Sequence, residues 1–103
     1  MFRKTRHIHF IGIGGIGMSG MAELLQKLGF QISGSDSALS EKTSQLSGLG
    51  IQVYEGHDGS NVLDSDVVVY SSAVPKDNPE IVEAIKQNIP VIRRAEMLGE
   101  LLK

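Results

Sequence analysis

The run Gly12-Ile13-Gly14-Gly15-Ile16-Gly17 constrains the fold of this chain more than any other stretch of its sequence. It satisfies the pattern G-x-G-x-x-G, follows directly on an apolar strand pattern and opens a helical pattern at Met18. In such a unit the first glycine permits the tight turn, the second lets a ligand approach the backbone, and the third lets the helix pack closely on the strand. The run therefore predicts a phosphate-binding βα turn, although the same glycines would also serve a turn that only packs.

Short β-branched runs alternate with helical patterns along the whole chain. Strands are predicted at 8–13, 30–33, 51–54, 67–70 and 91–92, and helices at about 18–28, 40–49, 79–87 and 95–102. The run 67–70 is apolar on both faces, as expected for a central parallel strand. Because β-α-β connections are right-handed crossovers, the chain is predicted to be an α/β protein. Its fold would be a Rossmann-like parallel sheet of about five strands, in the order 3-2-1-4-5, flanked by helices.

Single residues predict where the helices begin and end. Gly29 and Asn88 supply C-terminal stops, Asn78 caps the third helix, and Pro79 suits its first position. The apolar spacing also predicts which helical side chains face the core: Met18, Met21, Ala22, Leu25 and Leu28, then Leu46 and Leu49, then Ile81 and Ile85.

Length, charge and cysteine content limit the function classes. The 103 residues fit one domain, and the absence of cysteine excludes disulfides, thiolate metal sites and a cysteine nucleophile, and fits a reducing cytoplasm. The net charge of −2, with both signs interspersed, predicts no nucleic-acid and no membrane partner. The apolar stretch after the basic residues 1–6 is too interrupted by glycine for a secretory signal and too short for a membrane span. Residues 1–6 are expected to be a disordered terminus.

A carboxylate supports nucleotide chemistry at the glycine-rich turn. Asp36, in Gly34-Ser35-Asp36, lies just after the second predicted strand, where a Rossmann-type domain places an acid against ribose hydroxyls. The helix that begins near Gly17, with the hydroxyl of Ser19, presents unpaired N–H groups to a diphosphate. These residues predict a nucleotide diphosphate site and leave NAD, FAD and a UDP-sugar open. The alternative for Asp36 is a cap on the following loop.

Two other clusters carry polar side chains. His7 and His9 place two imidazoles on one face of a strand, a spacing that can bind a metal, but no third ligand lies nearby and no metal site is predicted. Ser71, Ser72 and Ala73 follow the fourth predicted strand, at the edge where ligands gather in open α/β sheets. A simple turn ahead of Pro75 is the alternative for these three residues.

Five short motifs span nearly the whole chain. They are HFIGIGGIGMS at 9–19, GSD at 34–36, VYSSAV at 69–74, NPE at 78–80 and RRAEML at 93–98. In this order they resemble the N-terminal region of the UDP-N-acetylmuramate–L-alanine ligases of the Mur ligase family.

The resemblance implies that residues 1–103 are a single N-terminal UDP-sugar-binding domain of a larger three-domain cytoplasmic ligase of peptidoglycan synthesis. The missing central and C-terminal domains would then be partners of this one, holding ATP with Mg²⁺ and L-alanine respectively. The helix that runs into Leu102-Lys103 without a stop agrees with a following domain. Because the sequence has no G-x-x-x-x-G-K-[ST] string, no catalytic residue and no cofactor is predicted within this span.

The same resemblance implies which residues bind UDP-N-acetylmuramate. Asp36 would meet the uridine and His57 the uracil, while Arg93 or its neighbour Arg94 would line the muramate end. A solvated loop position is the alternative for His57, and an ion pair of Arg94 with Glu96 or Glu100 is the alternative for the arginines. The full set comprises Gly14, Gly15, Ile16, Gly17, Met18, Ser19, Asp36, His57, Ser71, Ser72, Ala73 and Arg93.

Three rival functions share these residues. The first is the NAD(P)-binding Rossmann domain of a dehydrogenase, and the second is a Rossmann module that senses a nucleotide and signals to a protein partner. The third is a ligase of the same family that adds a preformed tripeptide to the same sugar nucleotide.

Overall fold

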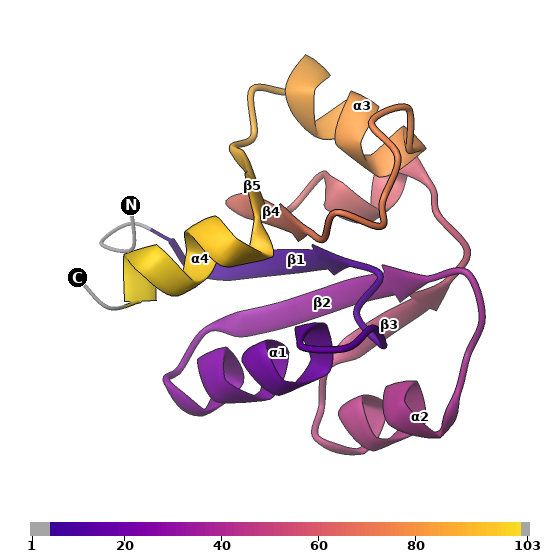
Figure 1. The fold of residues 1–103 in the computed structure, drawn as a ribbon, viewed down its shortest axis with the longest axis vertical. Coiled ribbons are helices and arrows are strands. Elements are labelled where there is room, and N and C mark those ends of the chain that lie inside the picture. Colours follow the sequence, from indigo (N-terminus) through magenta and orange to yellow (C-terminus); the bar gives the residue numbers. More distant parts are fainter. Residues whose placement is uncertain (1–4, 102–103) are drawn as a thin grey trace.

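A five-stranded parallel sheet forms the middle layer of the structure (Figure 1). The structure, a computed structural model, describes residues 5–101. The sheet has the order β3-β2-β1-β4-β5, which confirms the predicted topology. Its strands are β1 (His7–Ile11), β2 (Gln31–Asp36), β3 (Gln52–Glu55), β4 (Val67–Tyr70) and β5 (Val91–Arg93). Every residue of β1 is buried, as its central place in the sheet requires.

Helices cover both faces of this sheet (Figure 1). They are α1 (Met18–Lys27), α2 (Glu41–Gly48), α3 (Pro79–Lys86) and α4 (Arg94–Leu101), and a 3-10 turn, η1 (Gly59–Val62), precedes β4. The predicted helices are confirmed to within about two residues at each end, but η1 was not predicted. Within residues 5–101, no helix is long and apolar enough to cross a membrane.

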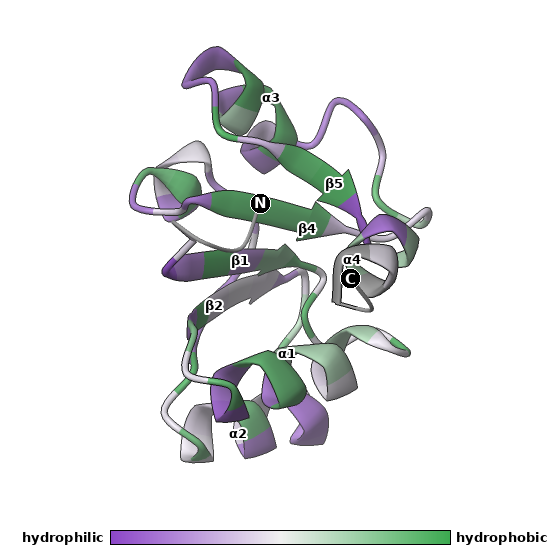
Figure 2. Cartoon of the chain, turned by 90° about the vertical axis from the view of Figure 1, so that its left-hand side faces the viewer, coloured by the Kyte–Doolittle hydropathy of each residue, from purple (hydrophilic) through white to green (hydrophobic). Residues whose placement is uncertain are grey.

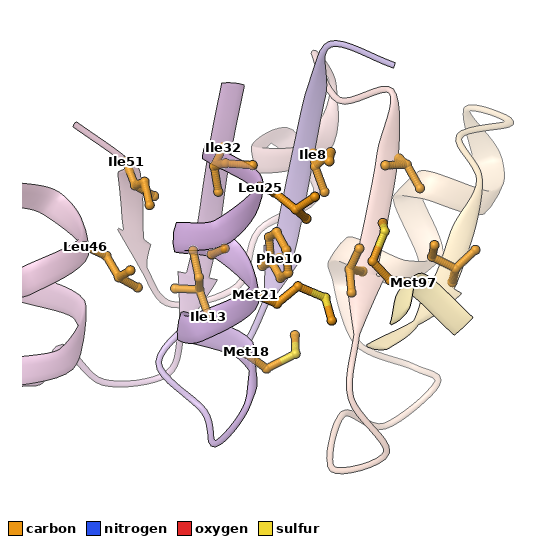
Figure 3. Packing of buried hydrophobic residues seen from close by; sticks show 14 residues of the cluster. Ile8, Phe10, Ile13, Met18, Met21, Leu25, Ile32, Leu46, Ile51 and Met97 are labelled. Carbon is orange, nitrogen blue, oxygen red and sulfur yellow. The ribbon is translucent and has the colours of Figure 1, made fainter. Parts of the chain in front are cut away.

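The larger core lies between the sheet and helices α1, α2 and α4. The even residues of β1, Ile8 and Phe10, are fully buried there (Figure 3). Figure 3 shows Phe10 beside Met21 and Leu25 of α1. Met97 of α4 belongs to the same core and lies to the right of β1 in this view. Fully burying each such side chain stabilises the fold by roughly 1.5–3 kcal/mol.

A smaller core lies on the opposite face, under η1 and α3. Its buried members are Ile11, Val62, Val68, Ile81 and Ala84. In Figure 2, β4 and β5 are coloured hydrophobic along most of their length, whereas α1 and α3 carry both hydrophobic and hydrophilic residues. Both faces of the sheet are therefore covered, and in an open α/β sheet of this kind a ligand is expected outside the carboxyl ends of the strands.

Three predicted core residues are exposed instead. Leu28 and Leu49 are 60% and 45% exposed because each is the C-cap residue just past the end of its helix, where the apolar stripe has rotated away from the sheet. Ile85 is 63% exposed because α3 packs through Ile81 and Ala84. The predicted caps are confirmed: Asn78 accepts a hydrogen bond from the backbone N–H of Glu80, and Gly29 and Asn88 follow their helices with positive φ.

The predicted disorder of residues 1–6 is wrong for the part that the structure describes. Thr5 is buried, and the backbone N–H of Arg6 donates to Oδ2 of Asp66 at 2.9 Å. Residues 1–4, and the predicted helix end at 102–103, lie outside the described residues.

Gly34 on β2 provides a test of how the sheet holds the glycine-rich turn. A Cβ at Gly34 would lie 2.4 Å from Cδ1 and 2.5 Å from Cβ of the buried Ile13. We expect Gly34→Ala to push Ile13 out of its site and lower the free energy of unfolding by about 1–3 kcal/mol, measured by urea denaturation. Gly20→Ala is the control, because its Cβ meets no atom within 4 Å and alanine should stabilise α1 by about 0.5–1 kcal/mol. Equal stability of Gly34→Ala and the wild type would contradict this account.

Candidate nucleotide-binding site

The glycine-rich turn is fastened to the carboxyl end of β2. The backbone N–H groups of Gly12 and Ile13 both donate to the carbonyl oxygen of Ser35, at 2.8 and 2.9 Å, and that of Gly15 donates to Gly12 at 2.9 Å. Gly12 and Gly17 have φ values of 77° and 79°, a left-handed conformation that glycine adopts without strain. The sequence thus builds a rigid turn whose position is set by two neighbouring strands.

Asp36 holds the same turn from its side chain. Its Oδ2 atom accepts the backbone N–H of Gly14 at 2.9 Å, while Oδ1 lies 3.4 Å from the N–H of Ala38. A Cβ at Gly14 would lie 3.0 Å from Oδ2, so any larger residue would push the carboxylate away by a few tenths of an ångström. One oxygen of Asp36 is therefore structural, and its predicted contact with a nucleoside stays a prediction for the other oxygen.

The N-terminus of α1 offers free hydrogen-bond donors. The N–H groups of Met18 and Ser19 point back to the carbonyl oxygen of Gly15, at 3.1 and 3.5 Å. Within residues 5–101, the N–H groups of Ile16 and Gly17 have no hydrogen-bond partner. No side chain caps this helix and its first turn holds no acidic residue, so the positive end of the helix dipole is not compensated there.

Two adjoining cavities run along this edge of the sheet. Both are bordered by Gly15, Ser71 and Ala73, which places the glycine-rich turn opposite the loop after β4. One cavity, of about 420 Å³, also touches Gly12, Asp36, Ser37, His57, Val74, Pro75 and Asn78. The other, of about 550 Å³, also touches Ile16, Met18, Ser72, Arg93, Arg94 and Ala95. Of the predicted site residues, Gly14, Gly17 and Ser19 border neither cavity.

The two arginines at the start of α4 behave differently. Arg93 is 62% exposed, and its Nε atom lies 3.4 Å from Oε1 of Glu96. The guanidinium of Arg94 lies 3.2 Å from the place of a Cβ on Gly17, so it packs against the glycine-rich turn. The alternative pairing of Arg94 with Glu96 is wrong, because Arg93 forms it; the side chain of Glu100 is not among those described. Arg94 thus places a positive charge against the turn that carries the free N–H groups.

A fully buried carboxylate, Glu80, lies beneath the cavity that touches Asp36. Its Oε1 atom accepts hydrogen bonds from Nε2 of His9 at 2.6 Å and from the hydroxyl of Ser35 at 2.8 Å. Its Oε2 atom accepts the backbone N–H of Asp58 and the amide of Asn61, both at 3.1 Å. Two strands and η1 therefore converge on one side chain at the start of α3.

The imidazoles of β1 belong to the same network. Nδ1 of His9 and Nε2 of His7 both lie within hydrogen-bond distance of the hydroxyl of Ser33, at 2.8 and 2.7 Å. Nδ1 of His7 reaches the carbonyl oxygen of Asp64 at 2.9 Å. All four ring nitrogens have a protein partner, which explains the spacing of His7 and His9 without a metal.

Sequence reasoning missed Glu80, Ser33 and Ser35 as contributors to the site. A signal was present, because His7 and His9 on one strand and Ser33 and Ser35 on the next alternate on a face predicted to be buried. Buried polar side chains at that spacing must hydrogen-bond to one another or to a third group. What the spacing could not supply was Glu80, which comes from a distant helix start.

The environment of Glu80 changes its acidity. Burial raises the pKa of Glu80, but the hydrogen bond and charge of His9, with the donors Ser35 and Asn61, outweigh burial and leave the pKa below its ordinary value. At the other end of β1, backbone N–H groups of His7 and Arg6 lower the pKa of Asp66. Both carboxyl groups are thus held as carboxylates by the fold.

The parallel sheet, its topology and the glycine-rich turn at its carboxyl edge define a Rossmann-like α/β domain. The family model described as the catalytic domain of the Mur ligase family matches residues 7–103. The chain belongs to the Mur ligase family.

Individual relatives agree with this membership. A UDP-N-acetylmuramate–L-alanine ligase of Syntrophus aciditrophicus is 62% identical over all 103 residues. The crystal structure of the UDP-N-acetylmuramate-alanine ligase of Thermotoga maritima matches 93% of the chain with a TM-score of 0.89 and 40% identity. The crystal structure of a Neisseria ligase for the tripeptide L-alanyl-γ-D-glutamyl-meso-diaminopimelate matches 93% of this chain with a TM-score of 0.82 and 35% identity. The match covers 31% of the Neisseria chain. The chain spans 22% of the length of each of the two alanine ligases.

The lowered pKa of Glu80 predicts how the fold responds to acid. A carboxyl group whose pKa is lower in the folded state stabilises the fold above its unfolded pKa, near 4.5, and that contribution is lost as the pH falls below it. We expect Glu80→Gln to lower the free energy of unfolding at pH 7 by about 1.5–3 kcal/mol. The variant should also lose less stability than the wild type between pH 4.5 and acid, as followed by urea denaturation at several pH values. Parallel curves for the two proteins would show that Glu80 is not the group responsible.

Proposed function

We propose that this chain binds the UDP part of UDP-N-acetylmuramate within a longer enzyme that joins L-alanine to the muramate carboxylate at the expense of ATP, in peptidoglycan synthesis. The observation that carries the proposal is that the free N–H groups of Ile16 and Gly17 lie beside the guanidinium of Arg94, where Ile16 and Arg94 border the larger of two cavities that share Gly15. The names of the relatives support the choice of substrate.

The diphosphate would lie at the junction of the two cavities, against the glycine-rich turn. Backbone N–H groups and a helix N-terminus favour an anion by about 0.3–1 kcal/mol, and by up to about 2 kcal/mol where the site is partly buried. Arg94 would add a charge-assisted, bidentate contact to phosphate oxygens. Ser19 is only 7% exposed and borders neither cavity, so Ile16, Gly17 and Arg94 are the donors we assign first to this group.

The nucleoside would occupy the cavity that touches Asp36 and His57. Oδ1 of Asp36, with only a 3.4 Å contact to Ala38, is the acceptor available to ribose hydroxyls. The muramate end would then enter the larger cavity, where Ser71, Ser72, Ala73 and Arg93 line the wall. This order gives the sugar nucleotide one direction along the sheet edge.

Catalysis belongs to the longer enzyme. The 103 residues contain no G-x-x-x-x-G-K-[ST] string, and residues 5–101 hold no group of three or more side chains suited to a metal ion. We therefore assign ATP and Mg²⁺, like L-alanine, to the remaining length of the relatives. The need for ATP places the proposed enzyme in the cytoplasm.

The rival functions receive less support. A dehydrogenase domain or a nucleotide sensor would share the fold, but the relatives are ligases. The tripeptide-adding ligases share the domain too, and among the solved structures the identity to an alanine-adding ligase, 40%, is slightly higher than the 35% to a tripeptide-adding one, which supports the alanine-adding reaction.

The first experiment is an NMR titration of the labelled chain with UDP-N-acetylmuramate, with UMP and NAD as comparators. We expect the largest shifts at residues 14–19, Asp36 and 71–73, and the strongest response to the UDP-sugar. Gly17→Asp should weaken UDP-sugar binding about ten- to hundredfold, because a carboxylate there repels the diphosphate and attracts Arg94.

Gly17→Asn is the matched control for this substitution. Asparagine has the same size and tolerates the positive φ of Gly17, but it adds no charge. It should retain most of the binding, and unchanged strand resonances would show that both variants fold. A response to NAD alone, or equal loss in both variants, would overturn the assigned turn.

The two arginines give a second test of the proposed diphosphate position. We expect Arg94→Ala to weaken UDP binding by at least about tenfold, since it removes a charge-assisted contact beside Gly17. Arg93→Ala should change UDP binding less than about threefold, because Arg93 is exposed and paired with Glu96. Isothermal titration calorimetry with UDP would measure both, and the reverse ranking would place the diphosphate elsewhere.

A further inference from the structure

We propose that Glu80 and Ser35 are positioning residues that fix the tautomer of His57, and that His57 thereby selects a base carrying an N–H donor. This inference rests on the proposed nucleotide site and adds a specificity mechanism to it. The relevant contacts lie in a layer of buried side chains directly under the cavity that touches Asp36 and His57.

The hydrogen bonds determine which nitrogen of His57 carries the proton. The hydroxyl of Ser35 donates its only hydrogen to Oε1 of Glu80 at 2.8 Å. Nδ1 of His57 lies 2.9 Å from the same hydroxyl oxygen, which has only lone pairs left to offer. Nδ1 must therefore be the donor in this contact.

The carboxylate itself acts in the same direction. Oε2 of Glu80 lies 3.4 Å from Nδ1 of His57, so a lone pair on Nδ1 would face two electron-rich oxygens at once. Glu80 is fully buried and is held by donors from β1, β2 and η1, so it cannot turn away. The neutral ring is consequently locked as the Nδ1–H tautomer.

This tautomer leaves Nε2 as a hydrogen-bond acceptor. The two nitrogens of an imidazole point to opposite sides of the ring, so Nε2 is directed away from the buried Ser35. Within residues 5–101 it has no hydrogen-bond partner, and the side chain of His57 is 24% exposed where it borders the cavity. Together with Oδ1 of Asp36, this end of the cavity offers acceptors and calls for donors on the ligand.

The two common pyrimidine bases differ in the donors of the ring itself. Uracil carries an N–H at ring position 3, whereas cytosine has a lone pair there and donates only from its exocyclic amino group, so a base that presents ring position 3 to Nε2 makes this hydrogen bond only as uracil. An unmade or repulsive hydrogen bond of this kind changes affinity by about two- to tenfold or more. The network therefore favours uridine over cytidine nucleotides without any side chain that reads the whole base.

The tautomer can be measured without a ligand. Two-bond ¹H–¹⁵N correlation spectra of the labelled chain, with the His57 signals assigned from His57→Asn, should show a protonated Nδ1 and a bare Nε2. Ser35→Ala removes the hydroxyl acceptor and Glu80→Gln removes the charge, so in each variant the fraction of the Nε2–H tautomer, the form that free imidazole side chains favour, should rise above that of the wild type. Ser33→Ala is the matched control. It also removes a serine hydroxyl from β2, two positions away, but the hydroxyl of Ser33 contacts His7 and His9 and not His57. An Nε2–H tautomer in the wild type, or no change in Ser35→Ala, would overturn the positioning role.

The specificity is tested by binding. Calorimetric titration with UDP and CDP should show a preference of about two- to tenfold for UDP in the wild type and in Ser33→Ala, and a smaller preference in Ser35→Ala. UDP binding with the expected tautomers but no preference over CDP would overturn the selection by His57 and leave the proposed function standing. No binding of either nucleotide would overturn both the selection and the proposed function, while the tautomer spectra would still decide the roles of Glu80 and Ser35.

Discussion

The carboxylate of Glu80 is the interaction on which the arrangement of this domain depends. Moving an ion of this size out of water costs several kcal/mol even after the protein relaxes, and hydrogen bonds must offset that cost. Glu80 meets the requirement with donors from β1, β2 and the loop around η1, while it sits in the first turn of α3, where the helix dipole also favours it. None of these elements can shift without leaving a buried charge unpaired, so their relative positions are fixed together.

Ser35 links the buried network around Glu80 to the glycine-rich turn. Its hydroxyl donates to Glu80, its carbonyl oxygen accepts the N–H groups of Gly12 and Ile13, and the next residue, Asp36, holds Gly14. The glycine-rich turn is thus attached to the buried network through one residue of β2 and its neighbour. Gly34 completes the attachment, since the absence of its Cβ gives Ile13 its place in the core. A turn held in this way keeps its free N–H groups in position before any ligand arrives, so binding would not have to order it.

The fold and the general place of the site could be predicted from the sequence, because both follow from local patterns. Strand and helix periods, the caps at Asn78 and Gly29, and the glycine spacing each act within a few residues, and together they determine the topology. The residues wrongly predicted to be buried lie where local patterns end. Leu28 and Leu49 lie just past the last turn of their helices, and α3 packs on the sheet through Ala84 and not through Ile85. The Glu80 network escaped prediction because it joins residues 71 positions apart, and no periodicity reports such a contact. The different contacts of Arg93 and Arg94 could not be predicted for a related reason. Adjacent residues at the start of a helix point in different directions, and the packing of α4 on the domain decides which of them faces the turn.

The two ends of the proposed site differ in how they are built. The end near Asp36 and His57 rests on fully buried groups whose hydrogen bonds are complete, so its preference for ligand donors is built into the domain itself. The end near Arg93 and Arg94 is formed by the loop after β4 and the start of α4, and Arg93 is largely exposed. An exposed arginine is screened by water and gains strength against an anion only when the surroundings become drier. Because the chain spans 22% of the length of the alanine ligases it matches, the rest of such a protein is available to cover that end. If the proposed site is correct, the groups that face the base lie within this domain, whereas strong binding of the acidic end of the ligand would need cover from the remaining length of such a ligase.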